Sequence, residues 1–339
     1  MARMLPVVAG FSSLGGLLVF VNPRSVATAM GHFDVWTLLP VLLLLLAFYF
    51  LQGLRWHFLL RRVGAVGRAA DHQLINLAGQ TLTAVLPLGD LARALLASKS
   101  SGVELGSAAA TVTVQELTFT LLVVAAAAPG LAHTPNGLML MLAVLVGIVA
   151  IIAILMVPRL FDLARRSAAA TPGLRRFVDD IETLQREVCR LLRRSDVLAG
   201  AVLDLGRVIC ATAALLLILR GLHVDFLGWW DVALVLAASF VGGALSLLPG
   251  GIGANEASVV GVLVVLGVNP AAAAAAAIVQ RLTLTLVPTA GGAIAYLVLR
   301  RRQTLTDRSV LQRRASAKSI RSANGASPSR EPVCAASAC

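Results

Sequence analysis

Eight apolar stretches occupy most of this sequence, and each has the length of a segment that enters or crosses a lipid bilayer. A helix needs about 20 predominantly apolar residues to cross the hydrocarbon core. Apolar residues make up 58% of the chain and charged residues 14%, whereas soluble domains contain about 45–50% and about 25%. This composition excludes a soluble enzyme and predicts an all-α polytopic membrane protein. The stretches are Leu5–Val21, Val35–Leu54, Leu74–Ala97, Ser107–Ala128, Leu138–Val157, Val197–Leu219, Val232–Val268 and Ala271–Leu299.

Two of these stretches are interrupted by proline and glycine. Leu74–Ala97 is broken at Pro87 and Val232–Val268 at Pro249, and a proline removes one hydrogen bond from a helix. The part before the first break, Leu74–Leu86, has 13 residues. As a helix it spans about 20 Å, which is less than the hydrocarbon thickness of about 30 Å. We therefore predict six spanning helices and two re-entrant hairpins, each of which enters the bilayer and returns to the same side.

The excess positive charge of the chain, +12, is concentrated in a few segments between the apolar stretches. Cytoplasmic loops carry an excess of Lys and Arg, so these segments orient the protein. We expect Arg55–Gln73, Arg159–Asp196 and the segment from Arg300 onward on the cytoplasmic side of the cell (inner) membrane, and both termini with them. The weakly charged segments Asn22–Asp34 and Pro129–Gly137 are expected outside.

The eight segments divide into two sets with the same order of helix, helix, hairpin and helix. Repeat one covers about residues 1–130 and repeat two about residues 137–301, and the second set begins on the opposite side of the membrane. The segment Leu82–Pro87 resembles Ala244–Pro249. Transporters use such inverted repeats to place a binding site near the middle of the bilayer. An inverted repeat of four and four segments within a transmembrane domain of residues 1–301 is the predicted architecture.

Three segments lie outside this pattern. Residues 158–196 are expected to form a cytoplasmic amphipathic loop, because Pro172–Asp196 has apolar residues at helical spacing between Arg clusters. Residues 302–339 are expected to be a disordered basic tail with an attraction to anionic lipid. At the other end, Ala27-Thr28-Ala29 after the first apolar stretch imitates a secretory cleavage site. Cleavage there is the alternative to a retained first helix.

Charged residues in the broken stretches are arranged reciprocally. The first hairpin carries Arg93 and the helix after it Glu116, whereas the second carries Glu256 and the helix after it Arg281. A charge at the centre of a bilayer costs at least about 2.5–3.5 kcal/mol, so such residues pair or line a wet cavity. We expect these charges to neutralise one another where the hairpins meet. Asp204 and Arg207 are three residues apart on one helix and are expected to neutralise each other. The alternative to a ligand site is a purely structural cluster of ion pairs.

The residues around these charges resemble those of the transmembrane, flippase-type region of the lysylphosphatidylglycerol synthase family. The second half carries the family signature P-x-G-x-G-x-x-E in Pro249–Glu256, followed by Arg281 before the glycine pair 291–292. The first half matches more loosely: Gly89–Arg93 resembles G-[D/E]-x-x-R, but Leu117 stands where the family has arginine after the glutamate. The resemblance covers residues from Leu5 to Arg301 and is to the membrane region alone, without an aminoacyl-transfer domain.

The resemblance implies lipid translocation rather than lipid synthesis. In that scheme two arginines hold a lipid phosphate, the acidic residues balance them or contact a cationic headgroup, and glycines provide backbone donors and pivots. The implied substrate-binding residues are Arg93, Glu116, Glu256, Arg281, Asp90 and Asn255. The implied hinge and backbone residues are Pro87, Gly89, Pro249, Gly250, Gly251 and Gly253.

The leading hypothesis is a flippase-like protein that moves a phospholipid or a polyprenyl-linked glycolipid between leaflets. A non-transporting scaffold or partner for a cell-envelope lipid enzyme and an integral lipid-modifying enzyme are the two alternatives. The sequence contains no HExxH, GxSxG, P-loop or dinucleotide motif, so neither catalysis nor a metal nor a cofactor is expected. The positive charge is not accompanied by a nucleic-acid-binding motif either, so the expected partner is a membrane lipid.

Overall fold

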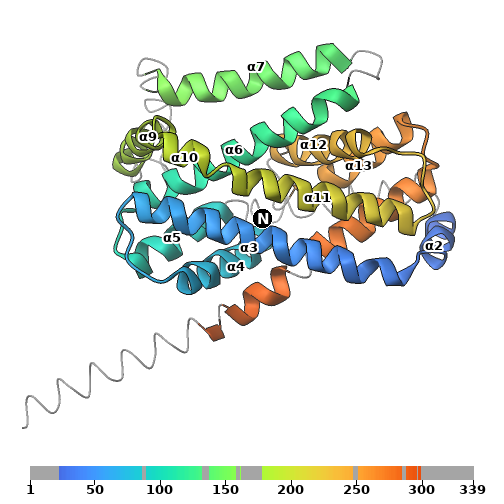
Figure 1. The fold of residues 1–339 in the computed structure, drawn as a ribbon, viewed down its shortest axis with the longest axis horizontal. Coiled ribbons are helices and arrows are strands. Elements are labelled where there is room, and N and C mark those ends of the chain that lie inside the picture. The colour runs from blue at the N-terminus through green and yellow to red at the C-terminus, as the bar shows by residue number, and fades with distance from the viewer. Residues whose placement is uncertain are drawn as a thin grey trace, which may run out of the picture. The chain divides into compact units, whose positions relative to one another are not determined.

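A computed structural model describes residues 23–85, 89–131, 137–157, 161, 178–246, 251–284, 288–295 and 297–298. Within these residues every regular element is a helix (Figure 1), which confirms the predicted all-α class. The chain divides into two units, Met1–Ala295 and Tyr296–Cys339. The first apolar stretch and the predicted tail both lie outside the described residues. The helices are α2 (Pro23–Gly31), η1 (Val35–Thr37), α3 (Leu38–Arg62), α4 (Ala69–Val85), α5 (Gly89–Ser101), α6 (Leu105–Leu131), α7 (Gly137–Met156), α9 (Val178–Leu192), α10 (Ser195–Ala199), α11 (Val202–Gly221), α12 (Trp229–Leu245) and α13 (Ala254–Val265), followed by helical residues 270–284 and 288–295.

Four helical segments in the described part of the chain are long and apolar enough to cross a bilayer: Val35–Arg62, Leu105–Leu131, Ser195–Gly221 and Pro270–Ala295. Each contains or closely matches one of the predicted apolar stretches. A fifth predicted stretch, Leu138–Val157, forms the 20-residue helix α7, which carries no charged residue. The helices end where charge, glycine or proline accumulates, as the basic residues in the last turn of α3 illustrate.

Both interrupted stretches fold as two helices with a break between them. In the first, α4 ends before Pro87 and α5 begins at Gly89; in the second, α12 ends before Pro249 and α13 begins at Ala254. The prolines themselves lie outside the described residues. Within each stretch the two helices pack against each other. In the described residues each predicted hairpin therefore contains a packed pair of helices.

The two hairpins begin at opposite ends of α6, which has 27 residues and a length of about 40 Å. At one end, the Trp56 ring donates to Thr111 near the start of α6, and His57 next to it contacts His72 in the first turns of α4. At the other end, a Cβ atom placed on Gly130 would lie 2.5 Å from the carbonyl oxygen of Trp230 at the start of α12. Figure 1 shows the same arrangement, with α4 and α5 on the left and α12 and α13 on the right.

The core lies between α3, α6, α11, α12 and helical residues 270–284. The helices α3 and α11 run side by side (Figure 1), with Leu45 and Leu215 fully buried between them. Small residues permit close approach of the later helices: Ala273–Ala277 are at most 2% exposed. A Cβ atom on Gly292 would lie 2.1 Å from the carbonyl oxygen of Leu77 on α4. Such close packing through small residues is typical of helices in membranes.

One segment adds detail to the predictions and another differs from them. The segment expected outside, Asn22–Asp34, contains the short helix α2 and ends in a turn in which the Asp34 carboxylate accepts from the Trp36 N–H. Arg55, predicted to begin a cytoplasmic loop, lies inside α3 and is fully buried. The helix continues past Leu54 because Trp56 and Leu59 extend its apolar face into the core, and both are fully buried.

The predicted amphipathic helix is present as α9, while Pro172 and the residues up to 177 lie outside the described part. Its apolar side chains Val188 and Leu191 are buried in a cluster with Leu59 of α3 and Ala110 and Val114 of α6. This apolar stripe therefore packs against the protein itself, whereas the sequence predicted that it would lie on the membrane surface.

Candidate functional site

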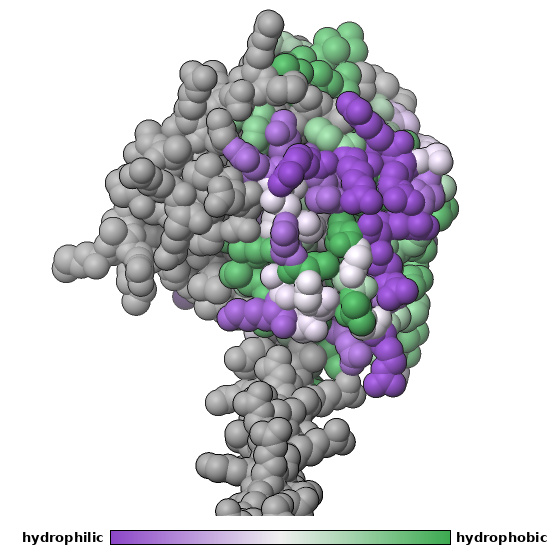
Figure 2. Space-filling view, turned by 90° about the vertical axis from the view of Figure 1, so that its left-hand side faces the viewer, coloured by the Kyte–Doolittle hydropathy of each residue, from purple (hydrophilic) through white to green (hydrophobic). Residues whose placement is uncertain are grey.

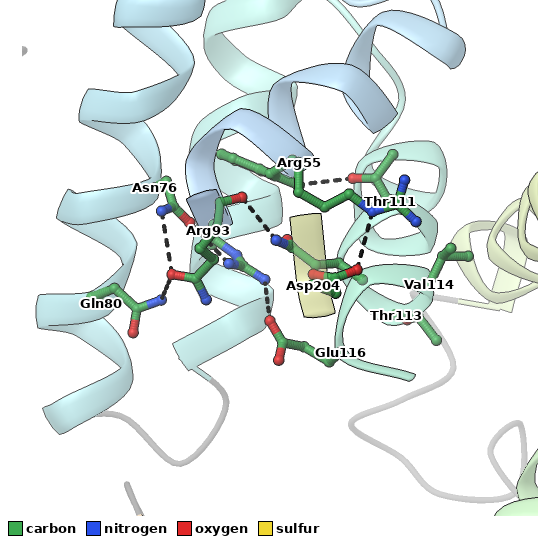
Figure 3. A network of polar contacts seen from close by, with 12 residues as sticks. Arg55, Asn76, Gln80, Arg93, Thr111, Thr113, Val114, Glu116 and Asp204 are labelled. Carbon is green, nitrogen blue, oxygen red and sulfur yellow. Dashed lines mark hydrogen bonds and ion pairs between the residues drawn. The ribbon is translucent and has the colours of Figure 1, made fainter. Parts of the chain in front are cut away.

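A buried network of charged and amide side chains connects α3, α4, α5, α6 and α11 (Figure 3). Arg93 of the first hairpin is at its centre, with its side chain only 1% exposed. Its Nη1 donates to Asn76 Oδ1 on α4 at 2.9 Å, and its Nη2 lies 3.2 Å from Glu116 Oε1 on α6. The guanidinium carbon is 5.2 Å from the centre of the Trp56 ring. The predicted pair of Arg93 and Glu116 is therefore formed.

Amide side chains hold this arginine in place. Gln52 Oε1 accepts from Asn76 at 3.4 Å and from Gln80 at 3.2 Å, so α3 and α4 are linked (Figure 3). Gln115 donates to the backbone oxygen of Gln52 at 2.8 Å and adds α6 to the network. Gly79 permits the close approach, because a Cβ atom there would lie 2.9 Å from Arg93 Cβ. Each of these hydrogen bonds gives a buried polar group its partner. Leaving such a group without a partner would cost about 1–3 kcal/mol of stability.

A second group of charges lies around Asp204 on α11. Its Oδ1 lies 3.0 Å from Arg207 Nη1, so the predicted pair of these two residues is confirmed. Its Oδ2 lies 3.1 Å from Arg55 Nε and also accepts from the Thr118 hydroxyl at 2.8 Å. Asp204 and Arg55 are fully buried, and Arg207 is 1% exposed. Asp204 thus joins α3, α6 and α11 through three contacts.

Arg207 is held between aromatic rings as well as by carboxylates. Its guanidinium carbon lies 4.1 Å from the centre of the Phe119 ring and 4.9 Å from that of Phe48. Arginine over an aromatic face is stabilised by about 0.5–2 kcal/mol. The planar group is therefore fixed in orientation without all of its N–H donors being used.

Glu116 connects the two groups of charges. Its Oε1 faces Arg93, and its Oε2 lies 3.9 Å from Arg207 Nη2. Its side chain is 35% exposed, far more than any other charged member of the network. Among the described side chains, three arginines (Arg55, Arg93 and Arg207) therefore face two carboxylates. These five described side chains sum to one net positive charge, and Glu116 is the most exposed member.

The second hairpin has the other predicted ion pair. Glu256 Oε1 lies 3.3 Å from Arg281 Nη1, and the two side chains are 4% and 22% exposed. Glu256 Oε2 accepts from the backbone N–H of Gly253 at 2.6 Å, so the glutamate also caps the start of α13. Gly253 and Gly251 have φ angles of 87° and 63°, which L side chains rarely adopt. These two predicted backbone residues therefore shape the turn into α13.

The remaining predicted site residues divide into two groups. Asn255 lies in the second hairpin, where its Oδ1 accepts from the Ser239 hydroxyl on α12. Gly89 is the first residue of α5, followed by Asp90, whose side chain lies outside the described residues. Pro87, Pro249 and Gly250 also lie outside them.

Sequence reasoning missed several members of the network. Arg55 was assigned to a loop, although apolar residues continue on both sides of it and could have indicated a helix. The amides Gln52, Asn76, Gln80 and Gln115 also lie inside apolar stretches, where unpaired polar side chains are costly. Their positions at the same depth as Arg93 follow only from the packing of α3, α4 and α6.

Comparison with known proteins supplies one finding. The family model described as the lysylphosphatidylglycerol synthase TM region matches residues 6–292. It includes both hairpins, both ion pairs and the polar network. No curated protein matches the chain by sequence.

Proposed function

The chain belongs to the lysylphosphatidylglycerol synthase TM region family, and we propose that it is a flippase-like protein that moves a lipid between the leaflets of the cell membrane. It is a multi-pass membrane protein of that family with helices long enough to span. The proposed cargo is a phospholipid or a polyprenyl-linked glycolipid. Both cargoes carry a phosphate, which needs a polar path through the protein to cross the apolar interior of the bilayer.

One observation carries the proposal: each broken hairpin holds one member of an Arg–Glu ion pair whose partner lies on the following helix. The distances are 3.2 Å for Arg93 and Glu116 and 3.3 Å for Glu256 and Arg281. Burying an ion pair rarely gains stability over packing two apolar side chains of similar size. In a lipid-embedded bundle, such pairs commonly mark the path of a polar substrate. The pairs therefore support a site for a charged headgroup.

The placement of the hairpins supports an inverted repeat. The first hairpin begins at the end of α6 that contains Thr111, and the second at the end that contains Gly130. If α6 spans the bilayer, the hairpins enter from opposite sides. Inverted-repeat transporters bind substrate near the middle of the bilayer.

The distribution of surface charge supports the proposed orientation. The end with α9, α10 and the turn after α3 exposes a hydrophilic surface (Figure 2). Among the side chains that the structure describes there, the exposed basic residues exceed the exposed acidic ones; they are Arg61, Arg68, Lys99, Arg186, Arg190 and Arg193, against Glu104. The end with α2 and the turn after α11 carries Arg24, Arg220, Asp34, Asp225 and Asp231. By the positive-inside rule the first end is cytoplasmic, which also places both termini there in the proposed topology.

In the proposed mechanism Arg93 and Arg281 hold the lipid phosphate, one on each side of the middle of the bilayer. Glu116 and Glu256 balance these charges while the site is empty. The left-handed glycines 251 and 253 shape the turn into α13, where the helix dipole favours an anion, and the N–H of Gly253 is held by Glu256 while the site is empty. Asp90 and Asn255 are each the second residue of their helix, α5 and α13, so they hold equivalent positions in the two proposed repeats.

The scaffold alternative uses the basic tail, which lies outside the described residues, and the amphipathic loop, whose helix α9 would need a free apolar face. That face is occupied by α3 and α6 of the same chain, with Val188 and Leu191 at most 1% exposed. Transport therefore accounts for more of the structure than scaffolding does.

Translocation of a fluorescent phosphatidylglycerol in proteoliposomes tests the proposal. Outer-leaflet fluorescence is quenched with dithionite, and the protected fraction reports lipid on the inside. In vesicles that contain the protein, we expect the labelled lipid to equilibrate between the two leaflets within minutes. In protein-free vesicles the labelled lipid should stay in its original leaflet. If all the phospholipid and polyprenyl-phosphate probes tested are equally slow with and without the protein, the proposal is wrong.

A further inference from the structure

Two carboxylates serve the buried arginines, but they are held in different ways. Asp204 is fully buried and has three contacts of 2.8–3.1 Å. Glu116 is 35% exposed, and its ion-pair distances are 3.2 and 3.9 Å. Asp204 cannot leave without stranding a charge in a low dielectric, whereas Glu116 can turn toward the exposed side at little cost. Of the two carboxylates, Glu116 is therefore the one that another anion can replace.

The second hairpin has no such exchangeable acid among its described residues. Glu256 is 4% exposed, and both of its carboxylate oxygens are engaged, one by Arg281 and one by the N–H of Gly253. Releasing it would also leave the N–H of Gly253 at the start of α13 without this partner. The glutamates of the two hairpins are therefore not equivalent, although the sequence places them reciprocally.

Arg93 and Arg207 lie on either side of Glu116, and other contacts hold both side chains in position. Arg93 is fixed by Asn76 and the Trp56 ring, and Arg207 by Asp204 and two phenylalanine rings. In the described part of the chain, the buried Nε of Arg207 has no hydrogen-bond partner. Guanidinium groups bind carboxylate and phosphate with the same planar geometry. A phosphate oxygen can therefore occupy the place of the Glu116 carboxylate without rearranging either arginine.

We propose that Arg93 and Arg207 together bind the phosphate of the translocated lipid and that Glu116 is an internal competitor which the phosphate displaces. The inference rests on the proposed function and adds Arg207, on α11, to the binding site. The two buried guanidinium groups that face Glu116 suit an anionic headgroup better than a cationic one. When Glu116 returns to its place between Arg93 and Arg207, it helps to release the phosphate.

The sign of one mutational effect tests this inference. Glu116→Gln keeps the shape of the side chain but removes the competing charge, so phosphatidylglycerol should bind about tenfold tighter, equivalent to about 1.4 kcal/mol. Arg207→Gln should weaken binding by at least about tenfold. The measurement is the dissociation constant of short-chain fluorescent phosphatidylglycerol for the full-length protein in detergent. Fluorescent diacylglycerol, which lacks the phosphate, should show no change in either variant.

Glu104→Gln is the matched control, because Glu104 is exposed, lies just before α6 and is outside the network. It should leave binding unchanged. Glu116→Asp retracts the carboxylate by one methylene and should tighten binding less than the glutamine variant does; it decides the question if Glu116→Gln fails to fold. Inorganic phosphate is titrated in parallel. Tighter binding of inorganic phosphate without tighter binding of phosphatidylglycerol overturns the assignment to a lipid.

Unchanged or weaker phosphatidylglycerol binding by the Glu116 variants overturns the inference, even if the wild-type protein translocates lipid. Conversely, tighter binding by Glu116→Gln in a protein that translocates no lipid supports the anion site and contradicts the proposed function. The two failures are therefore distinguishable.

Discussion

Arg55 on α3 and Asp204 on α11 form an ion pair, 3.1 Å from Nε to Oδ2, in which neither side chain has any exposed surface. The residues are 149 positions apart in the sequence. Because α3 belongs to the first predicted repeat and α11 to the second, this pair joins the two halves of the protein at their centre. Thr118 on α6 donates to the same carboxylate oxygen.

Asp204→Asn is expected to destabilise the protein more than Arg55→Met. Loss of the aspartate leaves two buried arginines without their shared carboxylate, which costs about 3–5 kcal/mol for a broken buried pair. Loss of Arg55 leaves Asp204 still paired with Arg207 at 3.0 Å. Thermal unfolding in detergent, followed by tryptophan fluorescence, measures both. Equal stability of the two variants would contradict the role of Asp204 as the shared partner of Arg55 and Arg207.

Gly292→Ala should lower the unfolding temperature by several degrees, because its Cβ would lie 2.1 Å from the Leu77 carbonyl oxygen. The backbones of α4 and the last described helix would have to separate. Gly291→Ala is the matched control, since nothing lies within 4 Å of a Cβ there. In a helix that control should be neutral or slightly stabilising, by about 0.5–1 kcal/mol. Two variants of similar stability would show that the two helices are not in close contact.

Leu191→Ala should destabilise the isolated protein by about 2–5 kcal/mol, the usual range for truncating a buried leucine. Leu191 is 1% exposed in the cluster with α3 and α6. Arg190→Ala on the exposed side of the same helix should change stability by less than about 0.5 kcal/mol. Chemical unfolding of the purified protein compares them. A harmless Leu191→Ala would indicate that the apolar face of α9 is free for another protein, as the scaffold hypothesis requires.

Single-cysteine labelling checks the orientation in the membrane. In a background without the native cysteines, Asp225→Cys in the turn after α11 should react with a membrane-impermeant maleimide in intact cells. Glu104→Cys, between α5 and α6, should react only after permeabilisation. Both positions are exposed, so accessibility to solvent does not limit either reaction. The opposite pattern would overturn the proposed topology.

Much of the fold could be predicted from local signals. Proline and glycine predict from the residues alone that each of the two stretches is interrupted, and the structure has α4 and α5 in the first stretch and α12 and α13 in the second. The rule that an apolar stretch ends at its first charged residue placed Arg55 in a loop, whereas Arg55 lies inside α3. Its partner Asp204 lies on α11, and only the packing of α3 against α11 shows that the charge is neutralised inside the core.

The ion pairs within each half were predictable because hairpin and following helix are neighbours in sequence. Arg93 with Glu116 and Glu256 with Arg281 are both formed. The link from Glu116 to Arg207 was not predictable, since it depends on the rotation of α11 about its axis. The difference in exposure between Glu116 and Glu256 likewise arises from how tightly each glutamate is enclosed in the folded protein.

The most direct test of the central claim compares single and double variants of Glu256 and Arg281. Each single variant, Glu256→Gln or Arg281→Met, leaves one charge without its partner and should lower thermal stability. The double variant should regain most of that stability, because apolar or neutral groups can replace a buried ion pair with little loss. Lipid translocation in proteoliposomes is measured beside stability. The account predicts a double variant that is stable but does not translocate lipid; a stable double variant with wild-type translocation would contradict it.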